Sequence, residues 1–294
     1  MRVVSHDDVH EFWRLAGPLY SADPVRHTAA VSVLARLRRG TGFSDHPPQL
    51  LTVHDDESGS GGSIIGAVYR TPPYPLGVSA LPVEAAGAVA EFLRAEHLQP
   101  GGASGDRARV EAFAAAWRRV AGVGHSIVMD LRLYRLAEAE LAPPTNVPGE
   151  LTFADERDFD LLVSLRRGFV QDTQHRAEME YLEEAVRGSL AAGSVHGIWR
   201  FDGKPVSVAL AGAPANGMSR VGMVYTPPEE RGHGYASAVT AAISQWALDQ
   251  GASDVVLFTD LANPISNSIY QRIGYRPVLD ALEVAFPPEP TPIP

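Results

Sequence analysis

The sequence predicts an α/β (α+β) fold in two tandem domains, each a mixed, mostly antiparallel sheet flanked by helices. The chain has 294 residues, 45% of them hydrophobic, which is enough to fill two cores of ordinary size. An uncharged, proline-rich segment at residues 141–149 separates two stretches of similar length. Helix and strand patterns follow the same order in both stretches, so we interpret the first as a diverged copy of the second.

These observations also give the expected domain boundaries. We expect an N-terminal domain over residues 1–140, a linker over 141–149 and a second domain over 150–286. Residues 287–294 are again rich in proline and are expected to form an extended tail.

Composition excludes several classes of protein. The chain contains no cysteine, which removes disulfides, thiolate metal sites and acyl transfer through a cysteine, and no metal site is predicted. A net charge of -10 disfavours nucleic-acid binding, which requires clustered Lys and Arg. No apolar run approaches the ~20 residues of a membrane span, and residues 1–8 lack the apolar stretch of a signal peptide. A cytoplasmic protein without membrane contact is therefore expected.

The first stretch is predicted to contain early helices, then strands and helices in alternation. Strands are expected near Gln49–Val53, Ser63–Tyr69 and Ser126–Tyr134, and helices over Val83–Glu96 and Arg107–Val120. Residues 81–87 are mostly bulky or acidic, where a phosphate-binding loop would need small residues. We therefore expect this stretch to be a non-catalytic partner domain.

The second stretch is predicted to form an antiparallel meander with helices before and after it. After a strand at Leu151–Phe153 and helices over Phe159–Phe169 and Met179–Ala191, three strands are expected: Val195–Phe201, Val206–Ala213 and Ser219–Thr226. Asp202-Gly203 and Asn216-Gly217 separate these three strands, and both pairs favour tight hairpin turns.

A glycine-rich loop follows the last of these strands. Arg231, Gly232, Gly234 and Ala236 lie between the strand and a helix whose apolar face continues to Ala247, and Val255–Thr259 is the next strand. A strand, a helix and a strand in succession usually form a right-handed parallel crossover, so the sheet should change from antiparallel to parallel here. Small residues and a permanent positive charge at a helix start suit a phosphate group. A nucleotide-bearing cosubstrate is therefore the first hypothesis.

A second motif runs from Asn263 to Tyr275. Asn263 and Pro264 are typical of a helix start and Gly274 of a helix end. Ile265, Ile269 and Ile273 are expected to form the apolar stripe of this helix, which leaves Tyr270 beside the stripe, where its hydroxyl could reach a ligand.

Together the two motifs resemble those of the GNAT acetyltransferases. Arg231-x-x-Gly234-x-Ala236 is similar to that family's acetyl-CoA-binding loop, and Asn263, Tyr270 and Gly274-Tyr275 are similar to its second motif. The resemblance covers residues 151–286, with the first stretch a suspected degenerate repeat. It implies direct transfer of an acetyl group from acetyl-CoA to an amine, and a β-bulge in the strand before the loop, to which Gly222 is a candidate contributor.

The resemblance also implies roles for individual residues. Tyr270 would protonate the departing thiolate as the catalytic acid. The backbone of Val224, Tyr225 and Thr226 would bind the pantetheine arm, with Asn263 and Asn267 as further contacts. The pyrophosphate would lie on the loop residues Arg231, Gly232, His233, Gly234, Tyr235 and Ala236.

The sequence leaves the general base and the acceptor open. The base is water or one of Asp172, His175, His196 and Asp260; a histidine on an apolar strand such as His196 is more often structural. The preferred acceptor is a small-molecule amine, ahead of a peptide N-terminus or a lysine side chain, and the protein is expected to be a monomer or homodimer.

Two other functions were weighed against acetyl transfer. A dinucleotide oxidoreductase is disfavoured because six residues, Thr226 to Arg231, stand between Tyr225 and the first glycine and Ser237 stands at the third glycine position. A non-catalytic acyl-CoA sensor stays an alternative, although Asn263 and Tyr270 argue against it.

Overall fold

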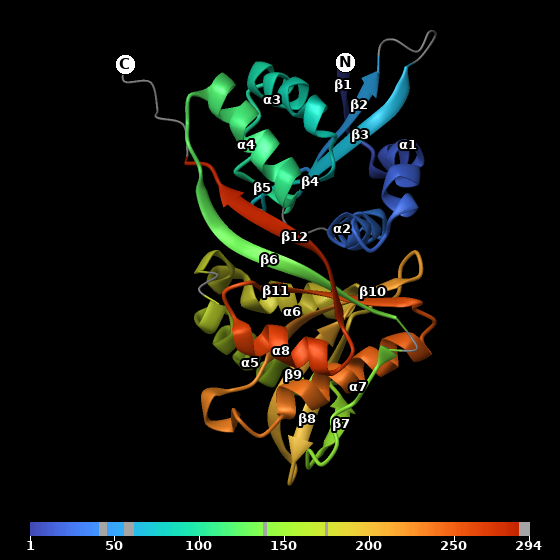
Figure 1. Ribbon diagram of the computed structural model, residues 1–294, viewed down its shortest axis with the longest axis vertical. Coiled ribbons are helices and arrows are strands. Elements are labelled where there is room, and N and C mark those ends of the chain that lie inside the picture. Colours follow the sequence, from blue (N-terminus) through green and yellow to red (C-terminus); the bar gives the residue numbers. More distant parts are fainter. Residues whose placement is uncertain (41–45, 56–61, 138–139, 174–175, 288–294) are drawn as a thin grey trace. The chain divides into compact units, whose positions relative to one another are not determined.

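The structure is a computed structural model that describes residues 1–40, 46–55, 62–137, 140–173 and 176–287 (Figure 1). It divides into two compact units that exchange segments of the chain. Unit 1 comprises Met1–Leu133, Asp260–Ala262 and Leu279–Pro294, and unit 2 comprises Tyr134–Thr259 and Asn263–Val278. The two units are described separately below.

In its described residues, unit 1 is a mixed sheet with four α-helices. Strands β1 (Arg2–His6), β2 (Gln49–Asp55), β3 (Ser63–Arg70) and β4 (Leu76–Ala80) pair antiparallel in this order, and β4 pairs parallel with β5 (Gly102–Asp106). The helices are α1 (Val9–Ala22), α2 (Thr28–Arg38), α3 (Ala86–Ala95) and α4 (Arg107–Ala121). The sequence pattern missed β4 and β5, because LGVSA and GASGD are short and rich in small residues with weak strand preference.

The last strand of unit 1 comes from the C-terminal end of the chain. Strand β12 (Arg276–Ala285) pairs antiparallel with β5, with Ala281 opposite Asp106 and Ala285 opposite Gly102. Its residues Leu282 and Val284 are buried in the same core as α3 and α4. Strand β6 (Ser126–Ala137), which follows α4 in the chain, instead carries Tyr134 and Leu136 into the core of unit 2.

Unit 2 repeats the element order of unit 1. Strands β7 (Glu150–Phe153), β8 (Val195–Phe201), β9 (Lys204–Ala211) and β10 (Met218–Tyr225) pair antiparallel, and β10 pairs parallel with β11 (Asp254–Asp260). The helices are α5 (Phe159–Thr173), α6 (Leu182–Ala191), α7 (Tyr235–Asp249) and α8 (Pro264–Arg272). The predicted mixed, mostly antiparallel sheet with a parallel pair is thus confirmed in both units.

The hairpin turns of unit 2 form as predicted. Asp202 and Gly203 have φ of 49° and 76°, and Asn216 and Gly217 have φ of 50° and 73°. Positive φ at two successive residues is the geometry of the tight turn that matches strand twist, and Asx-Gly pairs adopt it at little cost.

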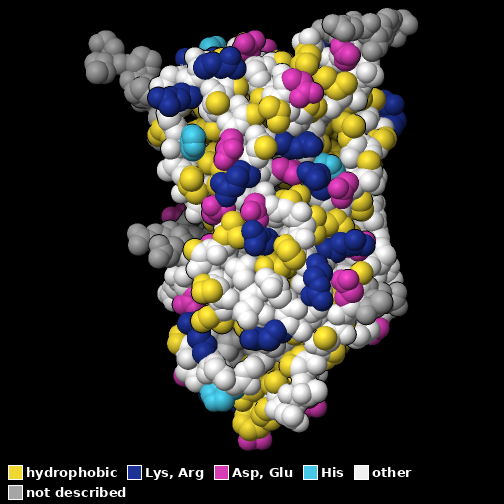
Figure 2. All heavy atoms as spheres, in the orientation of Figure 1, with side chains coloured by type: hydrophobic (Ala, Val, Ile, Leu, Met, Phe, Trp, Pro, Cys, Tyr) yellow, Lys and Arg dark blue, Asp and Glu magenta, His cyan; other side chains and the backbone are white. Residues whose placement is uncertain are grey.

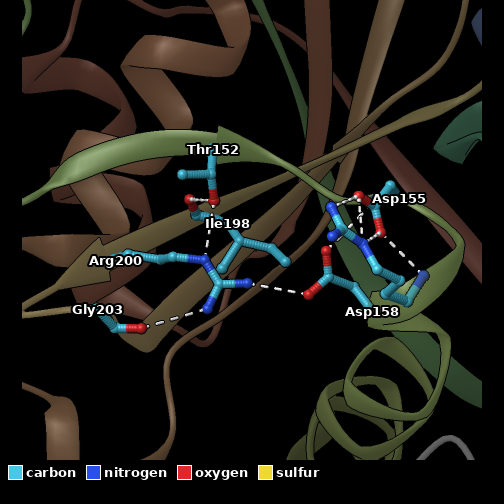
Figure 3. Close-up of polar contacts among 7 residues, drawn as sticks. Thr152, Asp155, Asp158, Ile198, Arg200 and Gly203 are labelled. Atoms are coloured by element: carbon cyan, nitrogen blue, oxygen red, sulfur yellow. Dashed lines mark hydrogen bonds and ion pairs between the residues drawn. The ribbon is translucent and has the colours of Figure 1, made fainter.

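A polar cluster ties the start of α5 to the edge of this sheet (Figure 3). Arg200 on β8 donates to Thr152 Oγ1 on β7 at 3.1 Å and to Asp158 Oδ1 at 2.9 Å. Asp158 and Asp155 form a reciprocal capping box immediately before α5. The cluster fixes the helix whose other end carries Asp172, one of the predicted base candidates.

Candidate active site

The sheet of unit 2 changes from antiparallel to parallel at β10, and the strand is irregular there. Its pairing with β11 covers Met218 to Arg220, opposite Asp254 to Val256. Its register with β9 shifts between Gly222 and Tyr225, and Met223 has a φ of 47°. A shift of this kind bends the strand and frees backbone groups from the ladder. The bulge expected near Gly222 is therefore present, with the strained residue one position further on.

The glycine loop ends at the start of α7, which has no side-chain cap. Gly234 is the N-cap with a φ of 84°, and Gly232 has a φ of 85°, so both need glycine's conformational freedom. A Cβ added to Gly232 would meet no atom within 4 Å. The N-H groups of an uncapped first turn attract anions, and α7 is a helix of 15 residues. The loop therefore has the backbone geometry that suits a pyrophosphate, with Gly232 open and Gly234 packed against Val147.

Arg231 lies beside this helix start and is held by two contacts. Its Nε donates to Thr226 O at 3.0 Å, and its Nη2 forms an ion pair with Asp172 on α5. The Arg231 side chain is 50% exposed and that of Asp172 is 41% exposed. Asp172, predicted to lie in a connection between helices, is in fact in the last turn of α5, because the apolar pattern of that helix extends to Val170.

The other loop residues are placed by packing. Tyr235 is buried, with its ring 6.2 Å from that of Phe201 and 5.4 Å from that of His233, which stacks on it. The Tyr235 side chain thus belongs to the fold, and its backbone N-H is what the first turn of α7 can offer. Ala236, the second residue of α7, is half-buried.

The last residues of β10 face neighbouring elements as well as the loop. Ser207 Oγ on β9 donates to Tyr225 O at 3.1 Å and lies 2.8 Å from Thr226 Oγ1. The Tyr225 hydroxyl packs on Gly168 of α5, where an added Cβ would lie 2.3 Å from it. Burial, and then the charge of Asp172, raise the pKa of Tyr225. Val224 is half-buried against the core of unit 2.

Asn263 and Asn267 make structural hydrogen bonds in α8. Asn263 Oδ1 accepts from Ser266 N at 3.0 Å, as expected of an N-cap. Asn267 Nδ2 donates to Asn263 O at 2.7 Å, and its Oδ1 accepts from the Tyr134 hydroxyl at 2.9 Å. The predicted contacts of these two amides with a cofactor stay predictions.

The apolar stripe predicted for α8 is partly wrong. Ile273 is buried, but Ile265, in the first turn of the helix, is 72% exposed. Tyr270, expected beside the stripe, is instead in the buried face, with 7% of its surface exposed.

Tyr270 packs among other aromatic residues of unit 2. Its ring lies 6.3 Å from that of Tyr134 and 6.1 Å from that of Tyr275. Burial raises the pKa of Tyr270 well above its usual value, so the hydroxyl keeps its proton at physiological pH. Within the described part of the chain the hydroxyl makes no hydrogen bond. It is thus a protonated donor without a partner, as an acid for a bound ligand needs to be.

Sequence reasoning missed Tyr134. Its hydroxyl donates to Asn267 and accepts from Gln271 Nε2 at 2.9 Å, so it holds two positions of the helix that carries Tyr270. It stands 133 positions before Asn267, and no local pattern links the two.

The structure separates the candidate bases. His196 is fully buried, lies 2.8 Å from Ser189 Oγ through Nε2, and burial lowers its pKa to about 4. These contacts suit a structural histidine. Asp260 belongs to unit 1 and accepts from Ala262 N at 2.7 Å. His175 lies outside the described residues, as do residues 288–294 of the predicted tail.

The described residues contain neither a candidate metal site nor a candidate membrane-spanning helix. No group of three or more His, Cys, Asp and Glu side chains that could hold a metal ion occurs among them. No helix there is long and apolar enough to cross a bilayer. On the face shown in Figure 2, Lys and Arg side chains are interspersed with Asp and Glu.

Comparison with known proteins agrees with the fold and the motifs. The model of the acetyltransferase (GNAT) family matches residues 159–275. A search of curated proteins found no match.

Solved structures match over nearly the whole chain, at low identity. A tandem GNAT protein from the clavulanic acid biosynthesis pathway covers 97% of this chain and 98% of its own, at 14% identity and a TM-score of 0.60. A GCN5-related N-acetyltransferase from Kribbella flavida covers 90% and 96%, at 19% identity and a TM-score of 0.54. A Drosophila protein covers 98% and 99%, at 15% identity and a TM-score of 0.68. The chain has the tandem GNAT fold and carries a domain of the GNAT acetyltransferase family at residues 159–275.

Proposed function

We propose that the protein is an acetyl-CoA-dependent N-acetyltransferase that moves an acetyl group directly to an amine of a small molecule. The observation that carries this proposal is the uncapped start of α7. Beside it, Gly232 has no atom within 4 Å of an added Cβ, and Arg231 supplies a positive charge. A family domain with that loop intact is expected to bind the donor.

The residues present fit coenzyme A. Residues 231–236 would hold the pyrophosphate through backbone N-H groups and the Arg231 guanidinium. The bulge interrupts the pairing of β10 with β9 between Gly222 and Tyr225, and the backbone from Val224 to Thr226 would bind the pantetheine arm through groups that Ser207 and Arg231 do not occupy. Bound acetyl-CoA supplies the thioester whose carbonyl carbon the amine attacks.

The proposed reaction requires two proton transfers. Tyr270, whose hydroxyl is protonated at physiological pH, would donate its proton to the sulfur as the carbon–sulfur bond breaks. The amine must lose a proton as the new carbon–nitrogen bond forms. We infer that water, or Asp172 once a phosphate competes for Arg231, accepts that proton.

Two features of the site support a small cationic amine as the acceptor. Asp172 places a carboxylate next to the loop, and Tyr225 presents a neutral hydroxyl close to it. An amine that is protonated in solution is attracted to such a group before it reacts. Unit 1 lacks a glycine loop before α3, and we assign it no transfer activity.

Release of free thiol from acetyl-CoA, measured across a panel of amines, tests this function. The panel should contain small mono- and polyamines, amino sugars, a peptide with a free N-terminus and a lysine-containing peptide. We expect thiol release above the amine-free rate with small amines first. Binding of acetyl-CoA without transfer to any amine would favour a sensor instead.

A further inference from the structure

Unit 1 contains a cavity that the proposed reaction does not use. Its volume is about 440 Å³, within the range of small-molecule sites. It lies beside the end of β4, where the sheet of unit 1 changes from antiparallel to parallel pairing. Leu19, Ile65 and Val83 supply apolar walls, and His27, Glu84 and Arg109 supply polar groups.

His27 offers the cavity an accessible ring nitrogen. The residue is 6% exposed, its Nδ1 lies 3.1 Å from Ser79 Oγ, and the Tyr20 ring meets it edge-on at 5.6 Å. Its Nε2, on the opposite edge of the ring, has no hydrogen-bond partner among the described residues. This nitrogen is not among the fully buried atoms of the described residues that lack a partner, so it is accessible to a ligand in the cavity and can hydrogen-bond to it.

The charge state of His27 decides what it can bind. Burial, and next the charge of Arg109, lower its pKa to about 4, so the ring is neutral at pH 7. When the Ser79 hydroxyl donates to Nδ1, Nε2 carries the proton and is a donor.

Arg109 is held rigidly against the end of β4. Its Nη1 donates to Ser79 O at 2.6 Å and to Leu81 O at 3.3 Å, and its Nε lies 3.6 Å from Asp106 Oδ2. Its Nη2 has no hydrogen bond within the described part of the chain. A fixed guanidinium with donors to spare is the usual partner of a carboxylate.

Glu84 gives the cavity the opposite charge. Its side chain is exposed at the cavity wall and has no ion pair among the described residues. Arg109, by contrast, belongs to a network with Arg26, Asp106 and Asp23 whose formal charges cancel. The cavity thus joins donors for an anion to a separate carboxylate.

This cavity is not a second pyrophosphate site. Pro82 and Val83 precede α3 where the corresponding loop of unit 2 has glycines. Arg109 donates hydrogen bonds to the carbonyl oxygens of Ser79 and Leu81. Residues with side chains thus stand in this loop where glycines would let a phosphate approach the backbone.

The geometry points to a binding site in unit 1 for a small zwitterion with an apolar body, such as an aliphatic amino acid. Its carboxylate would accept from His27 Nε2 and Arg109 Nη2, its ammonium would pair with Glu84, and its side chain would pack on Leu19, Ile65 and Val83.

Titration of the full-length protein with three isosteric probes tests the site, with binding followed by calorimetry and NMR. The probes are L-leucine, 4-methylpentanoate, which lacks the amine, and 3-methylbutylamine, which lacks the carboxylate. We expect saturable binding of one leucine per chain, and at least ten-fold weaker binding of the other two probes.

Two variants and a control locate the binding. Glu84→Gln should weaken leucine at least five-fold and His27→Phe at least ten-fold, whereas Glu91→Gln, an exposed carboxylate on α3 outside the cavity lining, should leave it unchanged. Unchanged thermal unfolding of Glu84→Gln keeps that result interpretable if His27→Phe misfolds. Absence of leucine binding, equal binding of the amine-free acid, or indifference to Glu84→Gln would each overturn the proposal.

Discussion

Burial shifts the pKa values of two residues of unit 2 in opposite directions, and both shifts favour the neutral form of the side chain. The pKa of Tyr270 rises well above its usual value and that of His196 falls to about 4, each mainly through burial. Tyr270 is therefore protonated throughout the physiological pH range, as the proposed mechanism requires. The shift of His196 makes stability depend on pH.

Replacement of Tyr270 by Phe is expected to lower the transfer rate at least 100-fold, the lower end of what general acid catalysis contributes. Affinity for acetyl-CoA should stay within two-fold, because the hydroxyl makes no hydrogen bond in the described residues and the ring packing is kept. Single-turnover kinetics and calorimetry measure the two quantities. An unchanged rate would remove the acid assignment from Tyr270.

His196 should make unit 2 less stable in acid. Well above pH 6.5 His196 is neutral in both the folded and the unfolded protein, so its contribution to stability is complete. As the pH falls from 6.5 towards 4, His196 becomes protonated in the unfolded chain but stays neutral in the native protein. The free energy of unfolding therefore drops by up to about 1.4 kcal/mol per pH unit.

His196→Leu should therefore reduce the slope of the free energy of unfolding against pH by an amount that corresponds to about one bound proton. Urea unfolding between pH 4.5 and 7 measures this slope. Ser189 Oγ keeps its bond to Val186 O at 2.8 Å, so the variant leaves no orphaned hydroxyl. His10→Gln, at an exposed position on α1, is the control. A slope unaffected by His196→Leu would show that this ring titrates alike in both states.

At the scale of elements, the cap of α8 separates a structural role from a binding role. Asn263→Ala should lower the free energy of unfolding by about 1 kcal/mol, whereas Asn263→Ser keeps a capping oxygen and most of the stability. If the amide also contacts the cofactor, Asn263→Ser should still weaken acetyl-CoA about five-fold. Wild-type affinity in Asn263→Ser would confine Asn263 to capping.

Local sequence predicted the elements around the site well, and for physical reasons. Asx-Gly turns, the glycine loop and the Asn263-Pro264 start are chosen by backbone conformation, which depends on neighbours in the chain. The exposure of Ile265 and the burial of Tyr270 were not predictable this way, because they depend on which elements cover α8. The contact of Asp172 with Arg231 likewise required the tertiary fold.

At the scale of the whole molecule, the exchange of the C-terminal strand escaped prediction. Nothing in the residues of β12 states that Leu282 and Val284 belong to the core of unit 1, because strand patterns specify an apolar face and not a partner.

Val284→Asp should therefore destabilise unit 1 by more than about 3 kcal/mol, although residue 284 is distant in sequence from the rest of it. Hydrogen exchange should rise in β5 and α4 and stay low in β8 and β9. Val278→Asp, at a position of the same strand that is 42% exposed, is the matched control. Equal protection of β5 from hydrogen exchange in wild type and Val284→Asp would contradict the placement of β12 in unit 1.

Binding of acetyl-CoA at the start of α7 is the central claim, and calorimetry of the full chain tests it directly. We expect one acetyl-CoA per chain, lost in Ala236→Glu, which places a carboxylate in the uncapped first turn, and retained in Ala88→Glu on helix α3 of unit 1. Absence of binding to the wild type, or equal binding by Ala236→Glu with an unchanged melting temperature, would contradict the account.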